Sequence, residues 1–125
     1  MSDSAVKVTD AEMELLQLLW AESPLGATDI ARRIPAERGW QLATVKTLLS
    51  RLAAKGAVHV TAEGRRNLYS PAVEREAIAG QVVGRLLDRL FSGRVSPLVA
   101  QLAEERDLTP EDLAELEALV RSLRK

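Results

Sequence analysis

Residues 41–71 read QLATVKTLLSRLAAKGAVHVTAEGRRNLYSP, and this stretch decides the fold. Its first half repeats apolar residues every three or four positions, which predicts an α-helix over residues 41–55 with one apolar stripe. Its second half alternates apolar and polar residues over 57–61 and returns over 67–70, which predicts two short strands. Gly64 lies between the two strands and suits a tight turn, so the sequence predicts a β-hairpin directly after the helix.

Two further helices are predicted before this stretch. Thr9 and Glu12 form a capping-box pattern ahead of an apolar run over residues 13–20, and a second helix is expected to begin at residue 27 or 28. Ser23-Pro24-Leu25-Gly26 reads as the turn between them. Three helices followed by a hairpin is the order of a winged helix-turn-helix domain, in which the third helix enters the major groove of DNA.

The exposed face of the third helix has small and polar side chains, so it is thin enough to approach base edges and able to bond them. Two adjacent arginines in the hairpin suit phosphate oxygens or a flanking minor groove. Taken singly, each feature is also typical of a solvated helix face or an ordinary hairpin loop, and the prediction depends on their combination. The residues predicted to contact DNA are Ala43, Thr44, Lys46, Thr47, Ser50, Arg51, Arg65 and Arg66.

The charge distribution agrees with a polyanionic partner. The net charge is −1, but residues 38–70 contain six basic residues and one acidic residue, whereas acidic residues are in excess on both sides. A positive segment between two negative ones indicates where a nucleic acid binds. Chance clustering on a solvated face remains the alternative from charge alone.

Composition excludes several classes of function. There is no cysteine and only one histidine among 125 residues, so cysteine nucleophiles, disulfides and multi-histidine metal sites are excluded. We find no catalytic triad and no phosphate-cradling loop, and we expect neither an enzyme nor a bound metal or cofactor. No apolar run is long enough for membrane insertion, and residues 1–8 lack a signal-peptide pattern, so a cytoplasmic protein is expected.

The remaining residues predict a second, helical domain. We expect residues 1–71 to form the winged helix DNA-binding domain and residues 72–125 a helical dimerisation domain, giving a mainly α protein with a small β-hairpin wing. Three amphipathic helices are predicted there: about 73–91, one capped by Ser96 with Pro97 in its first turn, and one capped by Thr109. Their apolar stripes are too wide for one short chain to cover, which favours a homodimer over a monomer whose tail folds back. The predicted dimerisation residues are Val83, Leu86, Leu87, Leu90, Phe91, Leu98, Val99, Leu102, Leu116, Leu119 and Leu123.

Several of these stretches together resemble one known family. They are AEMELLQLLW at 11–20, TVKTLLSRL at 44–52, EGR at 63–65 with YSP at 69–71, and LLDRLFSG at 86–93. In this order and spacing they resemble the penicillinase repressor family of BlaI/MecI type, and the resemblance covers about residues 9–123. Relatives tend to carry more aromatic residues on the second wing strand, where this chain has Tyr69 alone.

The resemblance implies a homodimeric transcriptional repressor that binds a palindromic operator in double-stranded DNA. It also implies release through cleavage of the C-terminal domain, triggered by a membrane-bound sensor metalloprotease. Relatives are cut at an Asn-Phe bond, and the matching bond here is Gln101-Leu102, which departs from that pattern. The copper-responsive branch of CopY type uses a C-terminal cysteine cluster, which this chain lacks. The alternative from another class is a winged-helix adaptor that binds proteins and has no specific DNA site.

Overall fold

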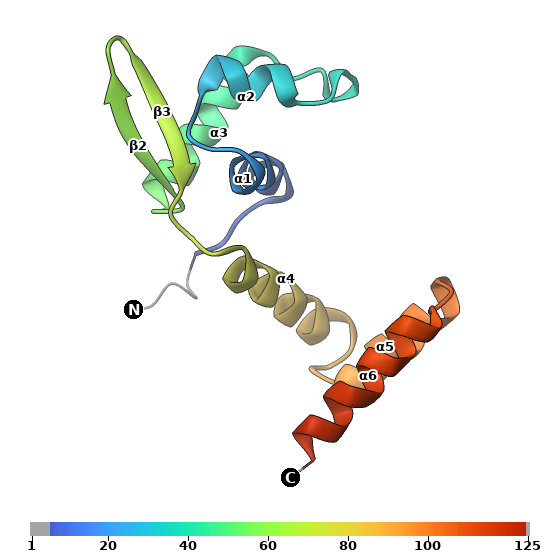
Figure 1. Cartoon of the computed structure of the whole chain (residues 1–125). Helices are drawn as coiled ribbons and strands as arrows, with labels where there is room; N and C mark the ends of the chain where they lie inside the picture. The colour runs from blue at the N-terminus through green and yellow to red at the C-terminus, as the bar shows by residue number, and fades with distance from the viewer. Residues whose placement is uncertain (1–5, 125) are drawn as a thin grey trace. The chain divides into compact units, whose positions relative to one another are not determined.

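A computed structural model describes residues 6–124 of the chain (Figure 1). Residues 1–5 and residue 125, which end the two predicted domains, lie outside the described residues. The chain divides into two compact units, Met1–Gln81 and Val82–Lys125. The sequence-based boundary at 71 and 72 falls earlier than this division, because Ile78 in the next helix is buried in the core of the first unit.

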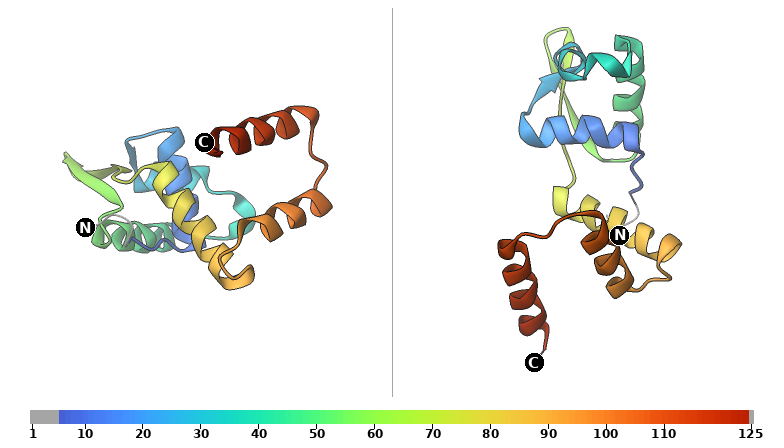
Figure 2. Two further views of the ribbon diagram at one scale, coloured as in Figure 1. Left: turned by 90° about the horizontal axis from the view of Figure 1, so that it is seen from below. Right: turned by 90° about the vertical axis from the view of Figure 1, so that its right-hand side faces the viewer.

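The N-terminal unit contains three helices and a small sheet, as predicted for a winged helix domain. Its α-helices are α1 (Asp10–Ala21), α2 (Ala27–Arg33) and α3 (Leu42–Ala54), and a 3₁₀ helix, η2 (Ala36–Arg38), separates the last two. The strands are β1 (Leu25–Gly26), β2 (Val58–Glu63) and β3 (Arg66–Pro71). The left view of Figure 2 shows the β2–β3 hairpin projecting from the helices of this unit.

The sheet has one strand more than the predicted hairpin. The strand order is β1-β3-β2, and all pairs are antiparallel. β1 lies where the sequence predicted only a turn, and it pairs Leu25 with Tyr69. A strand of two residues has no periodicity of its own, so only the distant partner strand reveals it.

The core consists of aliphatic side chains from all three helices and the base of the hairpin, together with Val8, Leu25 and Ile78. α1 supplies Leu15, Leu16 and Leu19, and α3 supplies four residues of its predicted stripe, Val45, Leu48, Leu49 and Leu52. Leu42 follows the same apolar repeat within residues 41–55 but is exposed, because it is the first residue of α3 and the buried contacts begin one turn later.

An ion pair fastens the end of α3 to the start of α1. Thr9 caps α1, and the backbone N–H of Thr9 donates to Glu12 Oε1 over 3.0 Å. The ammonium group of Lys55, at the end of α3, donates to the same carboxylate oxygen and forms the ion pair. Glu12 is only 1% exposed. Burial by itself would raise the pKa of the Glu12 carboxyl, but the Lys55 ammonium and the Thr9 N–H outweigh burial, and the pKa lies below its ordinary value.

The C-terminal unit is helical. α4 (Arg75–Leu90) begins in the first unit and continues into the second, followed by α5 (Val95–Glu105) and α6 (Pro110–Leu123). Thr109 caps α6 as predicted, through a capping box with Asp112. The predicted cap at Ser96 is wrong: α5 begins at Val95, and Pro97 fits within its first turn because that turn has no intrahelical acceptor for a backbone N–H.

Candidate nucleic-acid interface

The helix α3 presents its predicted DNA-contacting face to solvent. Its four buried residues fix the opposite side of the helix in the core. All six helix residues predicted to contact DNA are exposed: Ala43, Thr44, Lys46, Thr47, Ser50 and Arg51. The Thr47 hydroxyl donates to the Ala43 carbonyl over 3.0 Å, which leaves its methyl group and its oxygen lone pairs available at the surface. None of the six is acidic, so nothing on this face repels a phosphate.

A hollow of about 350 Å³ joins this face to the hairpin. It brings together four of the predicted residues, Lys46 and Ser50 from α3 and Arg65 and Arg66 from the wing. Ala43, Thr44, Thr47 and Arg51 do not line the hollow. Five further residues that line the hollow were not predicted from the sequence, namely Gly26, Ala27, Thr28, Asn67 and Tyr69. The polar residues at the start of α2 and along β3 could have indicated that these segments border the predicted interface.

The turn of the hairpin separates the two arginines. β2 ends at Glu63 and β3 begins at Arg66, so the turn itself is Gly64-Arg65, with Gly64 at a φ of 62°. A positive φ favours glycine because a Cβ would clash there. Arg65 therefore lies in the turn, whereas Arg66 is the first residue of β3 and lies opposite Glu63, the last residue of β2, in the antiparallel register.

The two arginines also differ in their electrostatic surroundings. Arg66 lies 3.5 Å from Asp29 Oδ2 on α2 and 3.4 Å from Glu63 Oε1, so two carboxylates partly compensate its charge. Among residues 6–124, no ion pair involves Lys46, Arg51 or Arg65. These three side chains present uncompensated positive charge on the interface.

Three cations elsewhere in the unit have partners of their own. Arg33 forms a two-point pair with Glu22, with distances of 3.0 and 3.1 Å, and Arg32 lies 3.4 Å from Asp29. Arg38 pairs with Glu14 and lies over the Trp40 ring. Among the described residues 6–81, the cations without an ion pair are Lys7, Lys46, Arg51, Arg65 and Arg75. Three of these five lie on α3 and the hairpin turn, and none lies on α2.

The predicted dimerisation residues lie on helices that have no core of their own. Within the described residues 82–124, no side chain is buried. Leu90 is 69% exposed and Leu123 is 80% exposed. Six others of the predicted set are also exposed, namely Val83, Leu86, Val99, Leu102, Leu116 and Leu119, whereas Leu87, Phe91 and Leu98 are half-buried.

The bond matched to the family's cleavage position lies inside a helix. Gln101 and Leu102 belong to α5, and both side chains are exposed. Gln101 Nε2 donates to Glu105 Oε2 over 3.1 Å, one turn further along. A protease that cleaves an extended backbone needs this turn of α5 to unwind first.

Within residues 6–124, no cluster of three acidic or histidine side chains has the arrangement of a metal site. In the same residues, every helix is too short or too polar to cross a lipid bilayer.

The fold is that of a winged helix-turn-helix domain, and the exposed, acid-free face of α3 beside the hairpin suits DNA. The sequence profile described as Penicillinase repressor matches residues 8–122. The chain therefore belongs to the penicillinase repressor family, the BlaI/MecI type. This family membership favours a repressor over the protein-binding adaptor.

Individual relatives are similar over most of their length. The Penicillinase repressor of Bacillus licheniformis is 26% identical over 110 residues, which cover 88% of this chain and 86% of the relative. The Methicillin resistance regulatory protein MecI of Mammaliicoccus sciuri is 25% identical over 116 residues, which cover 93% and 94%. A solution structure of the DNA binding domain of the repressor BlaI superposes with a TM-score of 0.52 and 28% identity, over 58% of this chain and 88% of that domain.

Proposed function

We propose that two copies of this chain bind a palindromic operator in the cytoplasm and block transcription of the neighbouring genes. Each copy lays α3 in a major groove and sets its hairpin on the flanking backbone. The observation that carries this proposal is the exposed, acid-free face of α3, which meets the hairpin at the hollow lined by Lys46 and Arg65. Lys46 and Arg51 reach base edges or phosphates, and Arg65 contacts phosphate.

The apolar faces of α4, α5 and α6 support pairing with a second copy. A monomer with exposed leucine stripes on all three helices is unfavourable, because each buried leucine or valine contributes about 1.5–3 kcal/mol. Pairing through a two-fold axis covers the same stripe on both copies and places two α3 helices on successive turns of the duplex, about 10 base pairs apart.

Release follows from breaking the link between the two DNA-binding units. While they are joined, binding of one unit raises the effective concentration of the other at its half-site. A sensor metalloprotease that leads to cleavage at Gln101-Leu102 separates α6 from α4 and removes part of the pairing surface. Each unit then binds with its own contacts alone, and operator occupancy falls.

The DNA-binding proposal is tested with purified full-length protein and the DNA upstream of its own gene. Gel shifts over a range of salt concentrations should show specific retention at concentrations where an unrelated duplex of equal length stays free. Lys46→Ala or Arg51→Ala should weaken binding by about 1–3 kcal/mol if the side chain reads a base. Arg106→Ala makes the same charge change between α5 and α6 and is the matched control. Equal affinity for operator and unrelated duplex would refute the proposal.

The pairing proposal has a separate readout. Light scattering of the free protein should give twice the mass of one chain. A mass of one chain at all concentrations, together with unchanged specific DNA binding, would refute the dimer while leaving the DNA site intact.

A further inference from the structure

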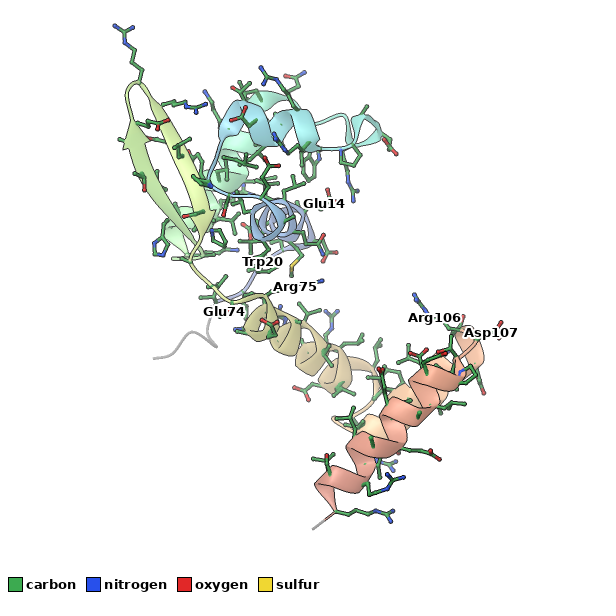
Figure 3. The ribbon with its side chains drawn as sticks, in the orientation of Figure 1. Glu14, Trp20, Glu74, Arg75, Arg106 and Asp107 are labelled. Carbon is green, nitrogen blue, oxygen red and sulfur yellow. The ribbon has the colours of Figure 1, made fainter. Side chains whose placement is uncertain are left out.

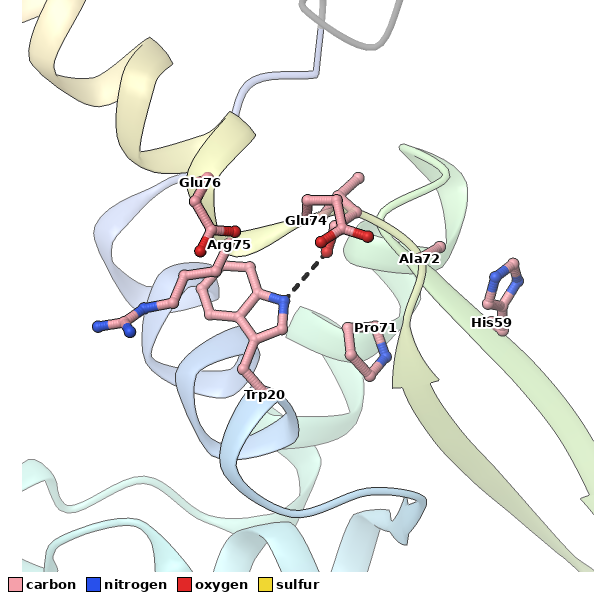
Figure 4. Close-up of a pocket in the computed structure, with 8 residues that line it drawn as sticks. Trp20, His59, Pro71, Ala72, Glu74, Arg75 and Glu76 are labelled. Carbon is pink, nitrogen blue, oxygen red and sulfur yellow. Dashed lines mark hydrogen bonds between the residues drawn. The ribbon is translucent and has the colours of Figure 1, made fainter.

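The segment of residues 72–74, which leads from the wing into α4, is held to the N-terminal unit at two points. The backbone N–H of Ala72 donates to the Ala57 carbonyl over 2.8 Å. The indole Nε1–H of Trp20 donates to the Val73 carbonyl over 3.0 Å, and these two residues are 53 positions apart in the chain. Figure 4 shows this hydrogen bond beside the start of α4.

The indole of Trp20 is only partly surrounded by other side chains. Figure 3 shows Trp20, Glu74 and Arg75 together where α1 lies next to the start of α4. A hollow of about 510 Å³ borders Trp20 along residues 71–76, and a second of about 310 Å³ borders it between α1 and Arg75. Trp20 and Val73 are partly buried and pack against the core, and the hydrogen bond between them adds a directional contact that fixes the segment against α1.

A third attachment lies one turn into α4. Ile78 is 2% exposed and belongs to the core of the N-terminal unit. No residue from 82 to 124 is buried in the same way. The bonds at 72 and 73 and the side chain of Ile78 therefore fix where α4 starts on the DNA-binding unit.

We propose that Trp20 is a positioning residue that sets the separation of the two half-sites the protein accepts, by holding the Val73 carbonyl and with it the start of α4. This inference rests on the proposed dimeric function. Two DNA-binding units joined through α4 gain the most affinity for a paired site when each unit is held in one orientation relative to its α4. If that connection is loose, the effective concentration of the second unit is spread over many half-site separations, and its value at any one separation falls. Trp20 lies on α1 and is not part of the DNA-contacting set.

The test removes the indole N–H and keeps the shape of the ring. In a Trp40→Phe background, Trp20 is replaced biosynthetically by benzothienylalanine, in which sulfur stands in place of the N–H. The Trp40→Phe chain with ordinary tryptophan is the matched control, and Trp20→Phe is a second variant. The probes are a duplex with one half-site, selected by the wild-type protein from random DNA, and duplexes with two inverted copies at separations of about 8–14 base pairs.

The control should bind one separation best. The benzothienylalanine protein should bind the single half-site within about twofold of the control, and should bind the best-spaced duplex about five- to tenfold more weakly, with a flatter dependence on separation. An unchanged separation profile would overturn the inference, and so would an equal loss on the single half-site, because that result makes Trp20 a residue of general stability. If the control itself shows no gain from a second half-site, the proposed dimeric function fails instead.

Discussion

Replacing Glu12 by glutamine tests whether the buried pair with Lys55 holds α3 in place. Glutamine keeps the volume of the side chain and an oxygen that accepts from the Thr9 N–H, but it loses the charge that Lys55 faces. A hydrogen bond to a charged group contributes about 1.5–3 kcal/mol, and removing one partner of a buried pair costs about 3–5 kcal/mol. The Lys55 side chain is 32% exposed, so water can solvate its charge in part when the Glu12 carboxylate is gone. We therefore expect Glu12→Gln to lower the free energy of unfolding by about 2 kcal/mol, below the range for a fully buried pair.

The assay is urea unfolding of the full chain followed by tryptophan fluorescence. Trp20 and Trp40 are the two tryptophans of the sequence, and both lie in the N-terminal unit, so their emission reports on that unit. A double-mutant cycle with Lys55→Met should give a coupling of about 1–2 kcal/mol. Glu14→Gln is the matched control on the same helix: its partner, Arg38, is half-exposed, and we expect a loss below about 1 kcal/mol.

The pH dependence follows from the lowered pKa of Glu12. A carboxyl that ionises more readily in the folded state contributes stability above its unfolded pKa, about 4.3, and loses that contribution as the pH falls through the folded value. The difference between wild type and Glu12→Gln should therefore be full at pH 7 and shrink below about pH 4. Equal losses for Glu12→Gln and Glu14→Gln, or no coupling with Lys55, would refute the reasoning.

Three further predictions concern the wing, the helix end and the C-terminal unit. Arg65→Ala should lower the slope of log affinity against log salt by about one, whereas Arg66→Ala should change it less because Asp29 and Glu63 already hold that side chain; equal slopes for the two variants would contradict this. Gly56→Ala should destabilise the N-terminal unit by about 1–2 kcal/mol in urea unfolding, since φ is 77° there, and an unchanged midpoint would contradict it. Leu116→Glu should halve the mass measured by light scattering while single half-site binding stays intact; a persistent dimer would show that α6 lies outside the pairing surface.

Features that depend on residues close together in the chain were predictable from the sequence. The stripe of α3 from Val45 to Leu52, the hairpin turn at Gly64 and the Thr109 cap each depend on neighbours within a few positions. These local rules also identified the exposed face of α3, which holds the helix residues predicted to contact DNA.

The parts that were missed depend on partners far along the chain. β1 exists only because β3 lies beside it, and the Glu12–Lys55 pair joins residues 43 positions apart. The ion pair between Arg66 and Asp29 also joins residues far apart in the chain. Because the sequence does not show this pair, the adjacent residues Arg65 and Arg66 looked equivalent. Periodicity shows which face of an element is apolar, but it does not say which distant side chain will meet a given charge.

No side chain among residues 82–124 is buried, so on the proposed pairing with a second copy these helices are stabilised only by that copy. Because the copy binds the folded helices, the pairing proposal predicts that their stability rises with the logarithm of protein concentration. The N-terminal unit has its own core and does not share this dependence. As the protein becomes scarce, its C-terminal half should open to digestion by added trypsin while the winged half still resists.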